Sequence, residues 1–168
     1  MTMAKHPSHL AHAGGFTLIE VLIAVLVLAV GLLGMAGLQV TGLRNNQSAY
    51  YRSQATQLAY DMADRMRANP VGLNNGNYNN QASTNDNCVT NACSASQMAG
   101  YDLAQWASDL AAQLPGGVGV VCVDNTPSDG TAAAPACDNT GAAYAIKVWW
   151  DDNRAGAANQ RFVTSFRP

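Results

Sequence analysis

The sequence predicts an α+β fold with one very long N-terminal helix, a short second helix and a small antiparallel sheet. An apolar segment near the N-terminus runs directly into a stretch with helical spacing of apolar residues, and a second helical stretch follows it. Three strand-like runs then occupy the C-terminal part. At 168 residues and 48% hydrophobic content, the chain has room for one small globular head, because about 120 residues follow Leu43.

The first helix begins in an apolar segment, residues 14–38, whose only charged residue is Glu20. From Val21 to Leu38, 18 consecutive residues are apolar or glycine. As a helix they would cover about 27 Å, close to the hydrocarbon thickness of a bilayer, so a transmembrane span is predicted over residues 16–38. A carboxylate costs up to about 2.5–3.5 kcal/mol at the bilayer centre, and Glu20 therefore requires a cation from outside this helix.

A cut between Gly15 and Phe16 would supply that cation, because it creates an amino group at Phe16. Identical helices packed with an axial offset could then bring Glu20 of one chain to the terminus of the next. The rival interpretation is an ordinary secretory signal with small residues at Gly34-Met35-Ala36. The apolar run is longer than the ~7–15 residues usual in such signals, and Glu20 would lie inside it for no reason.

Residues 39–68 are predicted to continue the same helix, which then covers residues 16–68. Asp61 and Arg65 are spaced as an i,i+4 ion pair, and Pro70 supplies the stop. One apolar stripe runs along this half, with the spacing of a helix face: Tyr51, Ala55, Leu58, Met62 and Met66. Such a stripe is typical of a protein core and is not interpreted as a cofactor site.

The head is expected over residues 69–168. Its first part, residues 69–91, is rich in asparagine and is interpreted as a surface loop, because few of its residues could build a core. A second helix should begin at a capping box, Ser94 to Gln97, and end before Pro115. Its buried face is predicted to hold Leu103, Trp106, Leu110 and Leu114.

Three strands are expected over residues 118–123, 143–150 and 160–166, and their short connections favour antiparallel pairing. The residues of the middle run alternate between two faces, with one face set against the other as follows: Ile146, Val148 and Trp150 against Lys147, Trp149 and Asp151. The last connection begins with Asp151, Asp152 and Asn153. These three oxygen-bearing side chains in a row lack the alternating spacing of a calcium loop such as the EF-hand, so a plain hairpin turn is predicted. No metal site and no cofactor are expected.

All four cysteines lie in the head, at positions 88, 93, 122 and 137, which favours disulfides in an oxidising compartment. Residues 1–13 carry Lys5 and three histidines but no acid, as is typical of the cytoplasmic side of a membrane span. Four cysteines allow three pairings. The local pairing, Cys88 with Cys93 and Cys122 with Cys137, is the simplest and is favoured.

The ten residues from Gly15 to Ala24, GFTLIEVLIA, resemble the class III signal of type IV pilins and of type II secretion pseudopilins. This resemblance implies a type IV pilin-like fold with a cytoplasmic prepilin leader, residues 1–15. It also implies that a prepilin peptidase cuts after Gly15 and methylates Phe16, and that Glu20 supports insertion of the subunit into a growing filament.

Further along, the pattern YDL, Trp106, LPGG, Cys122 and VWWDD is similar to minor pilins of the PilV type, known as type IV pilus modification proteins. This resemblance implies a minor pilin in assembly or initiation of type IV pili, and hence in twitching motility and adhesion. The implied partners are other minor pilins, the major pilin and the inner-membrane assembly platform. The implied location is a single pass through the inner membrane with a periplasmic head, and later the pilus or cell surface.

The runner-up within this group is a minor pseudopilin of type II secretion. Two rivals belong to other classes: a membrane-tethered binding module that never polymerises, and a periplasmic redox protein. The spacing Cys88-x4-Cys93 lacks the Cys-x-x-Cys form that lowers a thiol pKa, so a structural disulfide is preferred.

An enzyme is not expected, because all three histidines lie before Gly15, at positions 6, 9 and 12. A chain cut after Gly15 therefore lacks Ser-His and Cys-His pairs and histidine-ligated zinc. The formal charge of −2 also offers no broad basic surface for nucleic acid.

Overall fold

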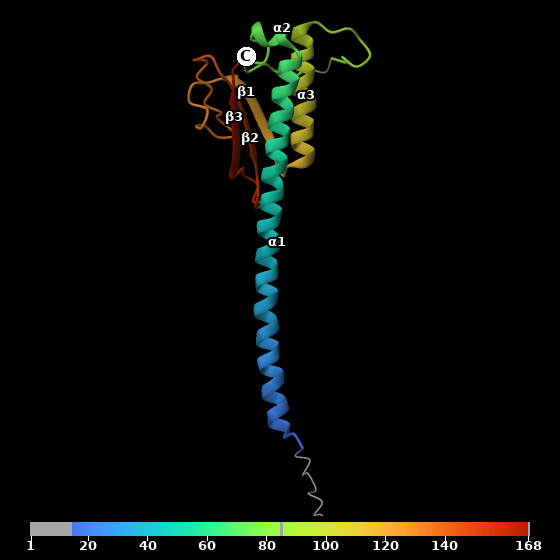
Figure 1. The fold of residues 1–168 in the computed structure, drawn as a ribbon, viewed down its shortest axis with the longest axis vertical. Coiled ribbons are helices and arrows are strands. Elements are labelled where there is room, and N and C mark those ends of the chain that lie inside the picture. The colour runs from blue at the N-terminus through green and yellow to red at the C-terminus, as the bar shows by residue number, and fades with distance from the viewer. Residues whose placement is uncertain (1–14, 85, 168) are drawn as a thin grey trace, which may run out of the picture. The chain divides into compact units, whose positions relative to one another are not determined.

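The computed structural model describes residues 15–84 and 86–167. The chain divides into two compact units, Met1–Arg44 and Asn45–Pro168, and each is described by itself. Helix α1, Leu18–Ala68, runs through both units (Figure 1). Most of the predicted leader, residues 1–14, lies outside the described residues.

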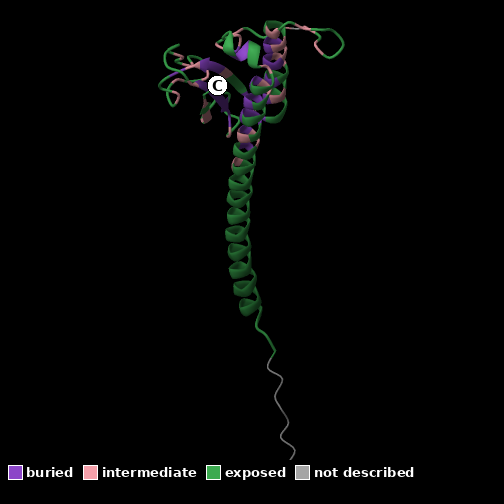
Figure 2. Ribbon diagram, turned by 45° about the horizontal axis from the view of Figure 1, so that its top comes forward, coloured by how far each residue is buried: buried purple, intermediate pink, exposed green. Residues whose placement is uncertain are grey.

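In the first unit, α1 is exposed along its whole length, and Figure 2 shows it green throughout. Its large apolar side chains from Leu18 to Leu43 have no partner within the described chain. The helix contains a stretch that is long and apolar enough to cross a membrane, and none of that stretch is buried. This composition fits membrane anchoring.

In the second unit, one face of α1 enters the core, and the predicted stripe is confirmed: Tyr51, Ala55, Leu58, Met62 and Met66 are all buried. The predicted pair is present as well, with Arg65 Nε lying 2.7 Å from Asp61 Oδ2. The helix ends at Ala68, where Asn69 begins a second short helix, α2, Pro70–Asn74. Proline is suited to this first helical position, because its missing N–H would have no partner there.

The interpretation of residues 69–91 as a surface loop is wrong for its first part. Tyr78 is 0% exposed, and the backbone N–H of Asn80 donates to Val121 O at 2.8 Å. The Asn69 side chain accepts from Gly72 N at 3.1 Å. The amides of Asn69 and Asn79 replace backbone partners at a helix end and beside a strand. Part of this segment therefore packs into the head, while residues 74–76 stay exposed.

Helix α3, Ala95–Gln113, begins with the predicted capping box: Ser94 Oγ accepts from Gln97 N, and Gln97 Oε1 accepts from Ser94 N at 3.0 Å. Its buried face carries Leu103, Trp106 and Leu110. The Trp106 indole N–H donates to Leu58 O at 2.9 Å, so α3 is bound directly to α1. A tryptophan satisfied in this way contributes its large apolar surface without an unpaired polar atom.

The sheet has the order β1-β2-β3, with β1 at Val118–Val123, β2 at Tyr144–Trp150 and β3 at Gln160–Phe166. Both pairings are antiparallel, as predicted, and every residue of β2 is buried. A Cβ at Gly119 would lie 2.4 Å from the Trp106 ring, which explains glycine on β1. Four residues of β2 face the helices as part of the core cluster: Tyr144, Ile146, Val148 and Trp150.

The other face of β2 is covered by a long connection without helix or strand, residues 124–143, hereafter the cover loop. Side chains of a strand alternate between its two faces, so Ala145, Lys147 and Trp149 point toward this loop. All three are buried. The central strand β2 is therefore enclosed on both faces, although helices lie on only one.

A buried polar pair links α3 to the segment after α2. Tyr78 OH donates to Asp102 Oδ2 at 2.6 Å, and Asn69 Nδ2 donates to Tyr78 OH at 3.1 Å. Burial raises the pKa of the Asp102 carboxyl, although the Tyr78 hydrogen bond and Arg65 act in the opposite direction. Burial and the Asp102 hydrogen bond also raise the pKa of Tyr78.

We expect Asp102→Asn to be at least as stable as the wild type near pH 7. Because the folded-state pKa of Asp102 lies above its unfolded value of about 3.9, folding takes up a proton between the two values. The wild type should therefore gain stability relative to the variant as the pH falls through the folded pKa toward about 4. Urea unfolding of both chains across this range measures the difference, with exposed Asp64→Asn as the control. A difference that is independent of pH would contradict the expectation.

Candidate functional site

The N-terminal site consists of Gly15, Phe16 and Glu20, which lie at the start of α1 in the first unit. Gly15 to Thr17 precede the helix, and the Phe16 side chain is 82% exposed. Thr17 caps the helix, because its Oγ1 accepts from Glu20 N at 3.3 Å while its carbonyl accepts from Val21 N at 3.3 Å. The peptide bond between Gly15 and Phe16 thus lies outside the helix, directly before its capped start.

Glu20 lies in the first turn of α1, where the partial positive charge of the helix N-terminus favours a carboxylate. It is the only charged residue between Leu18 and Leu43. Apolar side chains surround it in a shallow exposed depression, to which Phe16, Val21, Ala24, Val25 and Leu28 contribute. No described lysine or arginine forms an ion pair with it. The carboxylate is therefore open to a cation from another molecule.

The role of Thr17 was not predicted from the sequence, although the sequence contains a signal for it. The spacing Thr-x-x-Glu before an apolar run is the pattern of a capping box, and Thr17 to Glu20 has it. The structure shows the half of the box in which Thr17 accepts from the Glu20 backbone. The cap fixes where the helix begins, two residues after Phe16.

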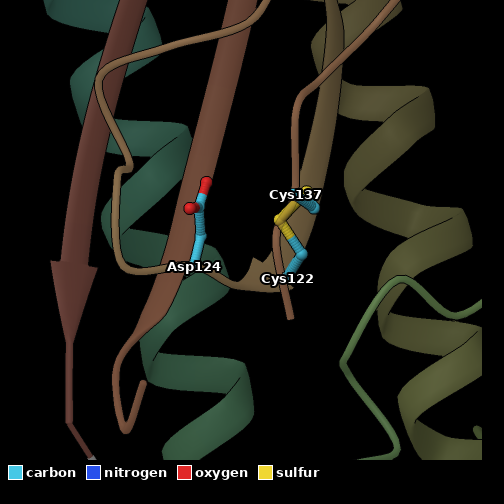
Figure 3. A group of neighbouring side chains, drawn as sticks. All are labelled: Cys122, Asp124 and Cys137. Atoms are coloured by element: carbon cyan, nitrogen blue, oxygen red, sulfur yellow. A yellow bond between two sulfur atoms is a disulfide. The ribbon is translucent and has the colours of Figure 1, made fainter. Parts of the chain in front are cut away.

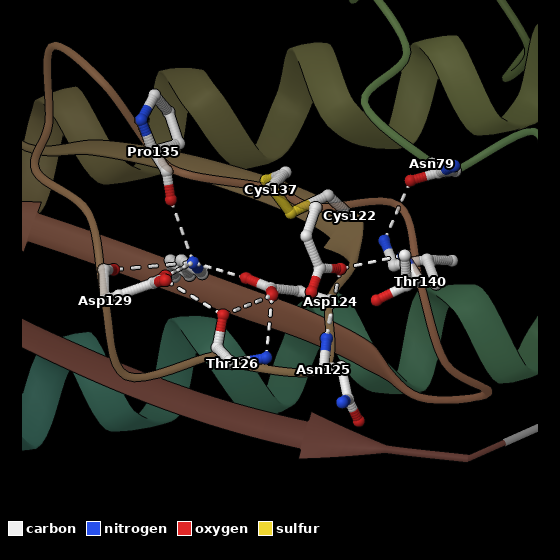
Figure 4. The surroundings of a disulfide bond; sticks show 12 residues. Asn79, Cys122, Asp124, Asn125, Thr126, Asp129, Pro135, Cys137 and Thr140 are labelled. Atoms are coloured by element: carbon white, nitrogen blue, oxygen red, sulfur yellow. Dashed lines mark hydrogen bonds and ion pairs between the residues drawn. A yellow bond between two sulfur atoms is a disulfide. The ribbon is translucent and has the colours of Figure 1, made fainter.

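In the head, the cover loop is held by a buried lysine. Lys147 is 0% exposed, and its Nζ lies 2.5 Å from Asp124 Oδ2 and 3.0 Å from Asp129 Oδ1. The carbonyl of Pro135 accepts from the same ammonium at 2.8 Å. Figure 4 draws these contacts around the neighbouring disulfide. The ammonium donates hydrogen bonds to Asp129 and Pro135 and forms an ion pair with Asp124, so three residues of one loop hold it.

Arg161 on β3 binds the same loop. Its guanidinium donates to the carbonyls of Asp129 and Gly130 at 3.0 Å each and also to that of Ser128. The hydrogen bond from Lys147 lowers the pKa of the Asp129 carboxyl. Sequence alternation placed Lys147 correctly on the face opposite Ile146, but no local pattern showed that an irregular loop would bury that face.

Both disulfides are present in the pairing favoured from the sequence, Cys88–Cys93 and Cys122–Cys137, with Cα atoms 5.4 Å and 6.1 Å apart. The first closes a short exposed segment before α3. The second joins β1 to the cover loop, and a closed loop of 15 residues stabilises a fold by about 3 kcal/mol in the chain-entropy model.

One group of side chains has the composition of a metal site but not its chemistry. Ligand atoms of Cys122, Asp124 and Cys137 lie within 4.8 Å of one another. Figure 3 shows, however, that the two sulfur atoms are bonded to each other, so neither is a thiolate. The Asp124 carboxylate pairs with Lys147 and accepts from Thr126 N at 2.9 Å. This group is a structural crosslink.

Two family models match parts of the chain. Residues 37–104 match a family model described as Type IV pilin Tt1218, and residues 10–36 match the prokaryotic N-terminal methylation motif. No curated protein and no solved structure matches the chain. The two matches support a type IV pilin, which is a structural subunit of a pilus system. The methylation motif implies processing by prepilin peptidase and assembly with other pilins.

We expect Lys147→Met to lower the free energy of unfolding by about 3–5 kcal/mol, because Asp124 would remain buried without its partner. The double variant Lys147→Met/Asp124→Asn should recover part of this loss, since it removes the stranded charge. Urea unfolding of the full chain in detergent micelles, followed by tryptophan fluorescence, measures both. A single variant within about 0.5 kcal/mol of the wild type would show that the pair does not hold the cover loop.

Proposed function

We propose that the protein is a minor pilin that takes part in assembly or initiation of type IV pili. The observation that carries this proposal is the isolated carboxylate of Glu20, which lies four residues after Phe16 on an exposed apolar helix and within the matched methylation motif. In the proposed mature form, prepilin peptidase has removed residues 1–15 and methylated Phe16.

The physics of the helix start explains why Glu20 matters. The amino group created at Phe16 is a cation next to the positive end of its own helix dipole, which repels it. A carboxylate beside this amino group would therefore stabilise it. In a filament core, the low dielectric strengthens such a pair and makes either partner costly if left alone. A subunit inserted with its terminus near Glu20 of a neighbour would satisfy both charges.

The proposed location is a single pass through the inner membrane with residues 16–38 in the bilayer and the head, residues 69–168, in the periplasm. After assembly the head would be at the pilus or cell surface. Two disulfides support an oxidising compartment for the head. The proposed partners are the major pilin, other minor pilins and the inner-membrane assembly platform, and the resulting pili would serve twitching motility and adhesion.

We expect the mature chain to begin at N-methylated Phe16. Intact-mass analysis and N-terminal peptide mapping of membrane-derived protein measure this directly. A bulky substitution such as Gly15→Leu should leave uncut precursor, while Gly42→Ala, farther along the helix, should be processed normally. A terminus at Gly37 would instead indicate ordinary secretion and refute the pilin proposal.

We expect Glu20→Gln to be processed and membrane-bound but to enter filaments at least about 10-fold less well than the wild type, which corresponds to about 1.4 kcal/mol. The substitution keeps the size of the side chain and removes only its charge. Immunoblots of sheared pili against the membrane fraction measure incorporation, and exposed Asp64→Asn is the matched control. Equal incorporation of Glu20→Gln and wild type would exclude the electrostatic role.

Deletion of the gene separates the two filament systems. Loss of surface pili with normal secretion supports the minor pilin. Loss of secreted enzymes with normal pili would instead favour a pseudopilin.

A further inference from the structure

The predicted hairpin between β2 and β3 is confirmed by their antiparallel pairing, and it leaves β3 at an edge of the sheet (Figure 1). On one side β3 pairs with β2 along its whole length, from Gln160 opposite Trp150 to Phe166 opposite Tyr144. On the other side, no backbone group of the described chain hydrogen-bonds to the backbone of β3. The N–H and C=O groups that point away from β2 are therefore open to a partner.

The opposite edge of the sheet, on β1, is closed by other parts of the chain. Asn80 N donates to Val121 O at 2.8 Å, and the side-chain oxygen of Asn79 accepts from Val123 N at 2.8 Å. Asn139 N also donates to Val123 O at 3.1 Å. Copies of the chain therefore cannot continue one sheet from β3 of one copy to β1 of the next.

Strand β3 lacks the features by which proteins usually block an exposed edge. It contains no proline and no lysine, and its register with β2 runs without a bulge. At 7 residues it is slightly longer than the typical strand of about 5–6. Most of its residues are aromatic or β-branched, which favours strand pairing: Phe162, Val163, Thr164 and Phe166.

The helix-facing side of β3 is apolar and incompletely covered. Paired residues of neighbouring strands share a face, so Phe162 and Phe166 lie on the same side as Val148 and Tyr144, which belong to the core. Both phenylalanines pack against the core but are only partly buried. An apolar side chain placed beside them would bury more of their surface.

The opposite side of β3, which faces the cover loop, carries a cation without a carboxylate partner. Arg161 and Ser165 share this side, and both are exposed. The Arg161 guanidinium donates to backbone carbonyls of the cover loop, and no described carboxylate forms an ion pair with it. Asp124 and Asp129 of that loop pair with Lys147 instead. An acidic side chain beside Arg161 would therefore be stabilised.

Helix α1 runs in the same direction as β3, because contacts join them at both ends of the strand. Arg52 Nη2 donates to Gln160 Oε1 at 3.3 Å, and the Arg67 guanidinium lies 5.0 Å from the centroid of the Phe166 ring. Two copies paired antiparallel through β3 would thus have opposed α1 helices, which chains anchored in one membrane cannot adopt. Parallel pairing in register would place Arg161 of one copy beside Arg161 of the other, and like charges repel.

We propose that β3 binds an extended segment of a different protein as a fourth strand of the sheet. The segment carries apolar side chains toward α1 and acidic side chains toward Arg161. Main-chain hydrogen bonds provide the affinity, and the alternation of side chains provides the specificity, as in other cases of strand addition to a sheet edge. This site belongs to the head alone and does not depend on the function proposed above.

The test uses the full chain in non-ionic detergent micelles and a fluorescently labelled peptide of about seven residues that alternates valine and glutamate. Fluorescence anisotropy should give a dissociation constant below about 1 mM. A peptide with lysine in place of glutamate, and the original peptide with N-methylated backbone amides, should each bind at least about 10-fold less well. Hydrogen exchange should slow at residues 160–166 when the original peptide binds. No binding, equal binding of all three peptides, or unchanged exchange in β3 would overturn the proposal.

Charge changes at exposed Ser165 locate the peptide. Ser165→Glu should weaken binding of the glutamate peptide by about 2- to 5-fold, and Ser165→Lys should strengthen it by a similar factor, as expected for one cross-strand charge pair. The matched controls are Ser108→Glu and Ser108→Lys on the exposed side of α3, which should leave the affinity unchanged. Equal effects at both positions would refute binding at the edge. Sedimentation without peptide tests the remaining occupant, since a dimer that either Ser165 variant dissociates would show that a second copy occupies β3 and would refute a different partner.

Discussion

Helix α1 is one continuous helix whose two halves require different environments. Up to Leu43 its apolar side chains are exposed on every side, and from Tyr51 onward only one stripe is apolar and that stripe is buried. An apolar circumference is stable in lipid or among other apolar helices, whereas an amphipathic one requires a core to cover its stripe. In the head, the other elements pack around residues 51–66 and cover this stripe.

A second constraint comes from the sheet, because β2 buries side chains on two faces and α1 and α3 cover only one of them. The cover loop covers the other face, and most of its contacts with β2 converge on Lys147. Asp124, Asp129 and Pro135, the oxygen partners of Lys147, all lie within the loop closed by Cys122–Cys137. The lysine of β2 is thus bound by a segment that a disulfide closes into a ring. Closing the ring and docking the strand favour each other, since each restricts the chain to the geometry that the other needs.

Much of this architecture was predictable from the sequence because it follows from local patterns. Helical spacing gave the stripe of α1, the capping box gave the start of α3, and alternation gave the three strands. The N-terminal residues Gly15, Phe16 and Glu20 were found for a similar reason, since a lone carboxylate in an apolar run is conspicuous. These features depend on residues that are near one another in the chain.

The features that were missed depend on partners distant in the sequence. Asn69 and Tyr78 were interpreted as solvated loop residues, but Tyr78 meets Asp102 on α3. The alternation around Lys147 was interpreted correctly, but its burial depends on a loop with no pattern of its own. Burial of a polar group is a tertiary property, and composition does not report it.

The buried position of Lys147 also determines how the head responds to chemical reagents. Only two lysines occur in the sequence, Lys5 and Lys147, so a chain cut after Gly15 carries a single side-chain amine. That amine is enclosed by the cover loop and is 0% exposed. Lysine-directed crosslinkers and acylating dyes would then find no target on the folded head. Modification at Lys147 would instead report the moments at which the cover loop leaves the sheet, and would give a chemical measure of local opening.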